Sequence, residues 1–521
     1  MKKYNGNKFS CEFVIDDCKF FGEITFDGIN TKAEIWSSEP IVINSVSDNI
    51  YGLIYDGMKY ITLMDSIFLS ENGASTARQG DKYVHRYNCI IHPRFVAIGS
   101  EWLENTTSVE KVWFSTDKLE KIFHDHFAYR PVIHVDESLV NNLIKCDLEY
   151  SQSKYGFQYN INDHIINKYH DIGTPPSVYI YTGSKEILSF KTGLGEFSLY
   201  HIEGQTSYGG SGVKSDISTQ FYMSLNESAS VEKIVHECWK VHNFIKILSG
   251  KEDYLSKICL EINGGQENGY FEIYVSTDTV EYSDVHFDSL LNAKMEKDYL
   301  SEIFQKWFDR HEDWKDARNQ LCHTYSSNNY NVDRVVKCAN IFDLIPDESK
   351  VDLPEDIKEA KVQARKIFRA LPDSLEKTSF LQALGRLGTK TLKHKINNRI
   401  DIILSNSDFE FQDLKFVAHQ AVDCRNYFVH GSNKKFDYDL HFDMVNFFID
   451  TLEFIFVVSD LIECGWKIDD WCKSYIPNHK VGRYFTEYPR LCFLKAQITT
   501  ECFLIASMAL KTLVSSSVVY L

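Results

Sequence analysis

Short apolar runs that alternate with turn residues dominate the first half of the chain. They are rich in β-branched and aromatic side chains, which favour strands. Asp27-Gly28 and Asp56-Gly57 are pairs typical of hairpin turns. The strand-like runs lie at 13–15, 20–26, 59–63, 88–98, 177–182, 186–191, 196–203, 218–225 and 269–276. The pattern therefore predicts an antiparallel, β-rich region.

One helix is predicted within this region, near 230–249. Apolar residues such as Ile234, Cys238 and Val241 recur there at the spacing of a single helical face. Gly250 follows directly, and glycine is the residue that most often ends a helix.

From about residue 296 the apolar residues change to helical spacing. The predicted helices cover 296–322, 355–371, 373–385, 389–405, 411–430 and 440–464. The last is apolar around most of its circumference, which is typical of a helix packed inside a bundle or against another subunit. We therefore expect an α+β protein with three parts. They are an antiparallel β-rich N-terminal domain (1–295), an all-α helical bundle (296–475) and a C-terminal extension (476–521) whose structure the sequence leaves open.

Composition narrows the class of protein. A chain of 521 residues is too long for a single hydrophobic core. An apolar content of 44%, with 14% aromatic residues, favours well-packed domains over disorder. The net charge of -17 argues against a protein that coats nucleic acid non-specifically. A local basic patch can still bind phosphates.

Cysteine usage and the apolar segments indicate the compartment. The 13 Cys are scattered, with no C-x-x-C pair and no Cys/His cluster. We therefore expect free thiols in a cytoplasmic protein, without a disulfide framework or a metal site.

No apolar run follows the two N-terminal Lys residues, so no signal peptide is predicted. Charged residues interrupt the most apolar stretches, 440–464 and 502–521, so neither is predicted to span a membrane.

The segment 425–431, Arg-Asn-Tyr-Phe-Val-His-Gly, carries the strongest candidate chemistry. A guanidinium can hold a phosphate with two donors, and an imidazole can move a proton near neutral pH. The spacing alone is weak, because 14 Arg and 18 His give roughly half an Arg-x4-His by chance. A second occurrence, Arg318 to His323, has polar flanks and no following glycine or apolar helix. We therefore favour the first.

The geometry of a helix limits how these residues can meet. On an ideal helix Asn426 and His430 lie about 40° apart, whereas Arg425 and His430 diverge by about 140°. Arg425 and His430 converge if the helix ends at Gly431, or if a second copy of the motif faces the first. The ordinary alternative is a surface arginine at a helix end beside a capping histidine.

With its glycine and the apolar helix that follows, this motif resembles the signature of the HEPN superfamily. That signature is Arg, a polar residue, three further residues and His at the end of one helix of a small bundle. The order of the regions resembles ApeA-like anti-phage proteins, which pair an N-terminal β-rich domain with a C-terminal HEPN domain. Residues 18–28 and 304–308 support the resemblance, which covers most of 9–475.

The resemblance implies a metal-independent endoribonuclease that needs no cofactor. His430 would transfer a proton, Arg425 would stabilise the charged phosphorane, and Asn426 would orient His430 or the phosphate. Two subunits would bring their motifs into one cleft, so we expect at least a homodimer through the helical domain. Transfer RNA is the implied substrate, cleaved to halt growth during phage infection, with a phage-derived trigger acting on the N-terminal domain.

A different class of function remains open from the sequence. In this alternative the bundle is a non-catalytic HEPN-like module that only dimerises, and the β-rich domain binds a ligand or a protein. The intact Arg-Asn-x3-His motif favours the enzyme.

A basic stretch at 358–399 offers a place for the RNA. It holds eleven Lys and Arg against three acidic residues, a local excess of +8. Clustered charge of this kind is typical of a surface that binds a polyanion. The residues expected to bind RNA are Lys390, Lys393, Lys395, Arg399 and Arg386. The alternative is an ordinary solvated helix face.

Overall fold

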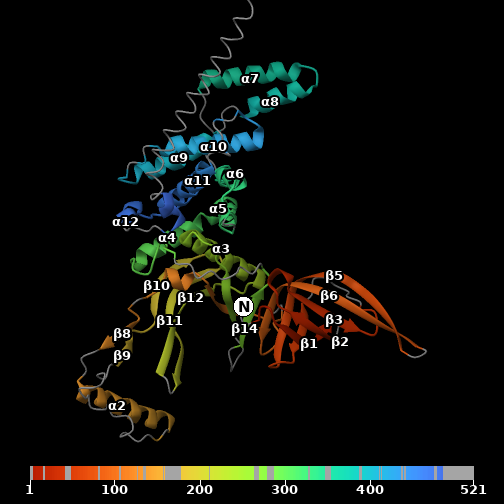
Figure 1. The fold of residues 1–521 in the computed structure, drawn as a ribbon, viewed down its shortest axis with the longest axis vertical. Coiled ribbons are helices and arrows are strands. Elements are labelled where there is room, and N and C mark those ends of the chain that lie inside the picture. Colours follow the sequence, from red (N-terminus) through yellow and green to blue (C-terminus); the bar gives the residue numbers. More distant parts are fainter. Residues whose placement is uncertain are drawn as a thin grey trace, which may run out of the picture.

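The strands gather at one end of the molecule and the helices α4–α12 at the other (Figure 1). The computed structural model describes residues 4–484 with gaps at 16–17, 42–48, 80–81, 105–106, 126, 133–135, 157, 159–177, 210–211, 263–268, 278–286, 327–328, 347–353, 387–389, 410, 412, 434, 436–437, 439–441 and 474–477. This arrangement confirms the predicted α+β class. The expected domain boundaries stay predictions, and most of 476–521 lies outside the described residues.

The first six strands form a closed ring. They are β1 (Lys8–Ile15), β2 (Cys18–Thr25), β3 (Lys32–Ser37), β4 (Ile50–Ile54), β5 (Lys59–Gln79) and β6 (Lys82–Gly99). Neighbours are antiparallel in the order β1, β2, β3, β6, β5, β4 and back to β1. Alternate residues point inward, so Phe13, Ile24 and Ile35 help to fill the interior. Gly22 is required, because a Cβ there would lie 2.3 Å from the carbonyl oxygen of Glu34.

The sheet continues beyond the ring through β14 (Gly269–Val275), which pairs with β6. The next strands are β13 (Leu255–Ile262), β7 (Val109–Thr116), β12 (Gly212–Leu225), β11 (Gly195–Gly209) and β10 (Lys185–Lys191), all antiparallel. Helix α3 (Val231–Ser249) packs on this part of the sheet through its apolar face. It ends at Gly250, whose φ of +60° is the left-handed conformation that glycine adopts readily. Both the helix and its terminal glycine confirm the sequence prediction.

A small unit lies away from the body of the protein (Figure 1). Strands β8 (Tyr129–Val132) and β9 (Val178–Tyr181) pair with each other, and α2 (Glu137–Tyr155) lies below them in that view. The short helix α1 (Leu119–Ile122) precedes them in the chain. The sequence did not predict α2. It has no buried residue, so it lacks the apolar face that reveals a helix in a sequence.

The C-terminal part is helical. Its helices are α4 (Lys297–Asp309), α5 (His311–Tyr325), α6 (Val332–Ile341), α7 (Glu355–Ala370), α8 (Leu375–Arg386), α9 (Leu392–Ser405), α10 (Leu414–His430), α11 (Phe442–Glu463) and α12 (Ile468–Lys473). α11 packs against α6, α9 and α10, while α7 and α8 form a hairpin that projects from the bundle (Figure 1). One continuous hydrophobic core joins these helices to α3 and the open part of the sheet.

Buried ion pairs attach α11 to its neighbours. Asp460 accepts hydrogen bonds from Nε and Nη2 of Arg318 in α5, both at 2.9 Å. Glu453 accepts from Nε and Nη2 of Arg334 in α6, at 3.0 and 2.7 Å. Arginine suits this task because its planar fork matches a carboxylate. The broad apolar surface of α11 is therefore buried within its own chain, which is the bundle alternative of the sequence prediction. No helix within the described residues is long and apolar enough to cross a membrane.

Two helix predictions need correction. The segment 296–322 is not one helix but two, which meet at Arg310. The guanidinium of Arg310 reaches α11, where it donates to Asp460 at 3.3 Å and also contacts Glu463. Helix α6 was not predicted at all. It is only ten residues long and begins at Asn331, whose side chain accepts the N–H of Arg334, so its helical pattern is too short to stand out.

Candidate active site at the end of helix α10

Helix α10 carries the predicted motif on its last turn. Its apolar stripe, which includes Leu414, Val417 and Ala421, is buried against the bundle. Gly431 ends the helix with a φ of +64°, and its N–H donates to the carbonyl oxygen of Tyr427 at 3.0 Å. This termination confirms the predicted helix end and leaves the motif at the surface of the bundle.

The motif residues meet within one chain. Nη1 of Arg425 lies 2.9 Å from Nε2 of His430 and donates to Oδ1 of Asn426 at 3.0 Å. A guanidinium has only donors, so Nε2 of His430 is the acceptor in this contact. Of the two ways in which Arg425 and His430 could converge, the structure therefore shows the helix end within a single chain.

A fourth polar residue, Asn340, holds the arginine from a different helix. Its Oδ1 accepts from both Nε and Nη2 of Arg425, at 3.2 and 3.0 Å. Asn340 lies one residue before the end of α6 and is half-buried. Sequence reasoning missed it because α6 was missed. An isolated asparagine also gives no signal of a contact 85 positions along the chain.

The exposure of the motif residues differs. Arg425 and Asn426 are half-buried, whereas His430 is exposed. The guanidinium is thus fixed by the two asparagines and the imidazole is open to solvent. A fixed cationic donor beside an accessible proton acceptor is the pairing that phosphodiester cleavage requires.

The competing motif, Arg318 to His323, does not form such a site. Arg318 is 0% exposed and is bound to Asp460 and to the carbonyl oxygen of Trp307. His323 is exposed on the same helix. Arg318 therefore stabilises the buried interior, and it shares no accessible surface with His323.

The five predicted RNA-binding residues have different surroundings. Lys393 forms an ion pair with Asp423 of α10 at 2.6 Å. Lys395 lies 3.6 Å from Asp343 and donates to its carbonyl oxygen at 3.4 Å. Lys390 is half-buried beside a hollow between α5 and α9. The side chain of Arg386, at the end of α8, lies outside the described part of the structure.

Arg399 departs from the expectation of a phosphate-facing side chain. It is only 6% exposed, and it donates to Ser459 at 2.9 Å and to Glu463 at 2.8 Å. These contacts tie α9 to α11. The sequence placed Arg399 in a basic stretch, but charge density does not reveal which cations turn inward to pair with carboxylates of neighbouring helices.

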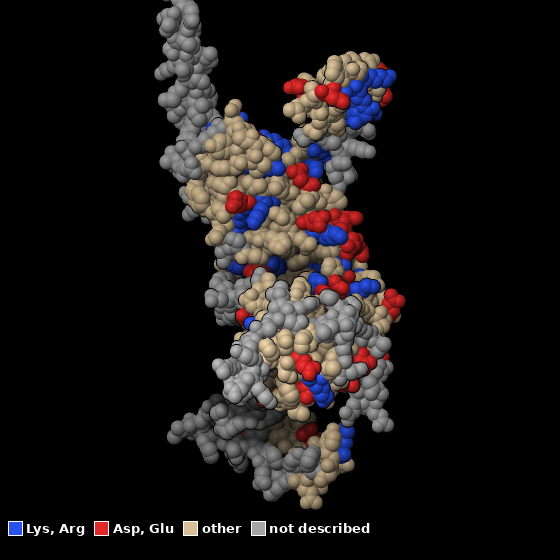
Figure 2. Space-filling view, turned by 90° about the vertical axis from the view of Figure 1, so that its right-hand side faces the viewer, with Lys and Arg blue, Asp and Glu red and all other residues tan. Residues whose placement is uncertain are grey.

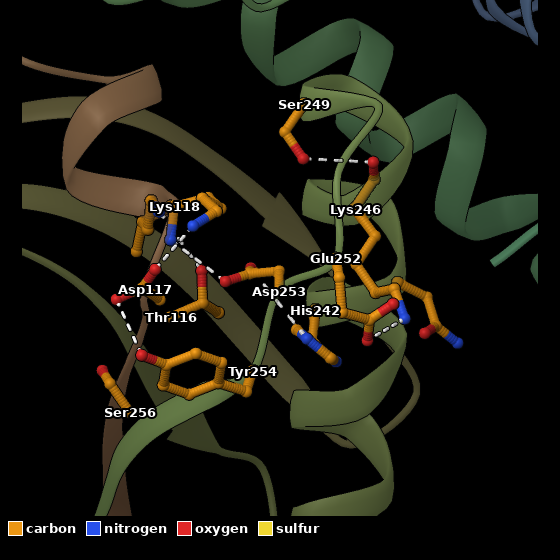
Figure 3. Close-up of polar contacts among 12 residues, drawn as sticks. Thr116, Asp117, Lys118, His242, Lys246, Ser249, Glu252, Asp253, Tyr254 and Ser256 are labelled. Carbon is orange, nitrogen blue, oxygen red and sulfur yellow. Dashed lines mark hydrogen bonds and ion pairs between the residues drawn. The ribbon is translucent and has the colours of Figure 1, made fainter. Parts of the chain in front are cut away.

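A second group of ionisable residues lies where β7 and β13 meet α3 (Figure 3). Oδ1 of Asp253 accepts the N–H of Lys118 at 3.0 Å, and Oδ2 lies 4.0 Å from Nε2 of His242. Burial raises the pKa of Asp253 to about 7 and lowers the pKa of His242 to about 3. Asp253 is only 1% exposed and caps the chain where α1 begins. Because this cluster is buried, we interpret it as structural, whereas the α10 motif is accessible to a substrate.

The cysteines and possible metal ligands add no further site. Every cysteine whose side chain the structure describes is a free thiol. Within the same described residues, no group of three or more His, Cys, Asp or Glu side chains is placed to hold a metal ion.

The site lies in a region that matches a known protein family. Neither the curated proteins nor the solved structures compared with the chain gave a match. Residues 336–470 match the family model described as Apea-like HEPN. The matched range contains Asn340 and the whole 425–431 motif, so the helical region that bears the candidate site is assigned to the Apea-like HEPN family.

Proposed function

We propose that the protein is a metal-independent endoribonuclease whose catalytic residues are Arg425 and His430, supported by Asn426 and Asn340. The observation that carries this proposal is the 2.9 Å contact between Nη1 of Arg425 and Nε2 of His430 at an exposed helix end. The family match supports it, because HEPN domains are generally ribonuclease-type enzymes.

The arrangement of atoms suggests how the pair acts on RNA. A phosphate oxygen is a better acceptor for Arg425 than a neutral imidazole, so a bound phosphodiester draws the guanidinium to itself. Nε2 of His430 is then released and accepts the proton of the ribose 2′-hydroxyl. The 2′-oxygen bonds to phosphorus while Arg425 stabilises the charge on the phosphorane.

Collapse of the phosphorane breaks the bond between phosphorus and the 5′-oxygen. The products are a 2′,3′-cyclic phosphate and a 5′-hydroxyl, and the departing oxygen takes up a proton. Each chain brings one His430 to its motif. In the homodimer that HEPN domains typically form, the imidazole of the second motif would supply that proton, and for this it must be protonated while the first imidazole is neutral.

The substrate and the trigger belong to the same proposal. Transfer RNA is the substrate, and its cleavage halts growth during phage infection. The β-rich N-terminal part then senses a phage-derived trigger and restrains the nuclease until it binds. The ApeA-like character of residues 336–470 supports this assignment.

RNA from cells that express the protein provides the test. Arg425→Ala and His430→Ala should each lower cleavage by roughly 10²–10⁴-fold, the usual contribution of an acid–base group, with unchanged thermal unfolding. His323→Ala, an exposed histidine of the competing motif, is the matched control and should cut normally. Cleavage should persist in EDTA and leave cyclic phosphate ends.

The same experiment separates the enzyme from a non-catalytic module. A binding module would leave cellular RNA intact whether or not His430 is present, and its expression would not become less toxic in the His430→Ala variant. Wild-type rates in either motif variant would show that the catalytic residues lie elsewhere.

A further inference from the structure

A hollow of about 340 Å³ opens among helices that are far apart in the sequence. It is lined by Arg310 between α4 and α5, by the segment after α6, by α9 and by the end of α11. Its charged lining consists of Arg310, Lys390, Lys395, Arg399 and Glu463. Folding thus brings four cations to one carboxylate, in a chain whose net charge is -17. Figure 2 shows Lys and Arg gathered both on the projecting hairpin and on the helical body below it.

The single carboxylate does not neutralise these cations. Glu463 is shared between Arg310, which it contacts closely, and Arg399, whose Nη2 donates to it at 2.8 Å. Arg310 also shares Asp460 with Arg318. A carboxylate that serves two guanidiniums leaves donors to spare, because each guanidinium carries five N–H groups. Lys395 also lies 3.6 Å from Asp343. Together with Arg318, the four cations of the hollow meet three carboxylates, Asp343, Asp460 and Glu463, so a positive excess remains.

The cations are held in place before any ligand arrives. The guanidiniums of Arg310 and Arg399 lie 4.4 and 4.8 Å from the centre of the Trp314 ring. Arg399 is fixed further by Ser459, to which its Nε donates at 2.9 Å. Side chains that are already ordered lose little entropy on binding. The planar guanidinium of Arg310, whose side chain is 25% exposed, matches the oxygens of a phosphate, whereas buried Arg399 adds only its charge.

The rest of the wall is apolar. Phe342, Ile345, Pro346 and Ile402 line it. The volume is near the lower end of the roughly 300–1,000 Å³ typical of ligand pockets. A ligand with an anionic group and a flat ring whose faces can pack on apolar side chains fits this lining, and a nucleotide has both, in its phosphate and its base.

We propose that this hollow binds the phosphate of one nucleotide unit. The ligand is either a nucleotide of the RNA strand next to the cleaved bond or a free mononucleotide. The proposal deepens the proposed ribonuclease function but does not depend on cleavage. Phe342 lies two residues after Asn340, which holds Arg425, so the hollow adjoins the segment that positions the catalytic arginine.

Calorimetric titration with adenosine 5′-monophosphate tests the hollow directly, on the full chain with His430→Ala so that no RNA is cut. The nucleotide should bind, and uncharged adenosine should bind at least tenfold more weakly. The double variant Lys390→Ala with Lys395→Ala should lower the affinity at least tenfold. Lys145→Ala with Lys154→Ala, on helix α2, removes the same charge outside both the hollow and the basic stretch and should leave this affinity unchanged.

A short fluorescent single-stranded RNA separates the two sources of the phosphate. If the monophosphate displaces the RNA, and Lys390 and Lys395 are needed for both, the hollow is part of the RNA path. If the monophosphate binds without displacing RNA, the hollow is a site for a free nucleotide. If neither ligand depends on the two lysines, the proposal is wrong. If the wild-type protein binds the nucleotide but cuts no RNA, the proposed phosphate site is supported and only the proposed ribonuclease function is wrong.

Discussion

At the residue scale, the orientation of Arg425 depends on a side chain outside the motif. Asn340 accepts two of its donors, so we predict that Asn340→Ala loosens the guanidinium and lowers kcat by roughly 10- to 100-fold. This range corresponds to the 1.5–3 kcal/mol of hydrogen bonds to a charged group. KM should change little, because Asn340 positions Arg425 and does not itself hold the substrate.

Two further variants distinguish positioning from a general structural effect. Asn340→Asp keeps an oxygen at the same place and should restore most of the rate. Asn397→Ala removes a comparable amide from α9, where Asn397 contacts His419 at 3.0 Å, and should leave kcat alone. An Asn340→Ala enzyme with normal kcat would show that Arg425 is held by other means.

A second prediction at this scale concerns pH and stability. Because the pKa of Asp253 is raised to about 7 in the folded state, the folded chain keeps a proton that the unfolded chain loses above about pH 4. This group therefore makes the protein less stable as pH rises from about 4 to 7. The lowered pKa of His242 acts in the opposite sense between about 3 and 6.5.

Asp253→Asn should remove the first contribution and keep the oxygen that caps Lys118. Relative to wild type, the variant should gain free energy of unfolding as pH rises from 4 to 7. The gain is at most about 1.4 kcal/mol per pH unit. Urea unfolding across this range measures the difference. A difference that does not vary with pH would mean that Asp253 titrates normally.

At this scale the sequence revealed the chemically active residues better than it revealed which residues contact each other. Arg425, Asn426 and His430 are close in the chain, so a local pattern was enough to single them out. Asn340 and Arg399 depend on partners 85 and 64 positions away. Residue type does not disclose whether a polar side chain there will face a ligand or a buried carboxylate.

At the element scale, the end of α10 sets the position of His430. Gly431 has a φ of +64° and open space around the position of a Cβ, so only backbone strain opposes a side chain there. We predict that Gly431→Ala lowers the free energy of unfolding by about 1–2 kcal/mol, the penalty of the left-handed conformation. It should also slow cleavage by displacing His430.

Gly431→Asn is the matched control, because asparagine tolerates this conformation better than alanine. It should retain more of both stability and activity, as thermal unfolding and cleavage rates can show. Equal behaviour of the two variants would mean that the backbone at residue 431 is free to relax. Helix ends marked by glycine, at residues 250 and 431, were predictable, whereas the break at Arg310 was not. At that break Arg310 forms ion pairs with Asp460 and Glu463 of α11, contacts that no local pattern encodes.

At the scale of the whole molecule, the sequence correctly placed strands before helices. It did not show that six strands close into a ring, because strand pairing joins residues far apart, such as Tyr60 and Gly99. Nor did it show that one core runs from the open sheet into the helices. Residues of the open sheet, of α3 and of α10 therefore share one packed core.

The structure also changes the argument for a dimer. Arg425 and His430 meet within one chain, so their expected divergence on a helix no longer argues for a second subunit. Helix α11 is buried in its own bundle, so its apolar surface does not require one either. Phe428 and Val429 of α10, directly before His430 in the chain, are 41% and 45% exposed. Exposed apolar side chains beside a site are typical of an interface.

We predict that two copies meet through this surface, related by a two-fold axis that sets each patch against its equivalent. Phe428→Asp would place like charges close to each other across the axis. It should raise the dimer dissociation constant at least tenfold, equivalent to about 1.4 kcal/mol, and lower cleavage in proportion to the dimer that is lost. Phe127→Asp removes an even more exposed phenylalanine (72%) next to β8 and should do neither. Sedimentation equilibrium combined with cleavage assays gives both readouts. A wild-type protein that sediments as a fully active monomer would contradict the dimer, and a Phe428→Asp protein that stays dimeric would place the interface elsewhere.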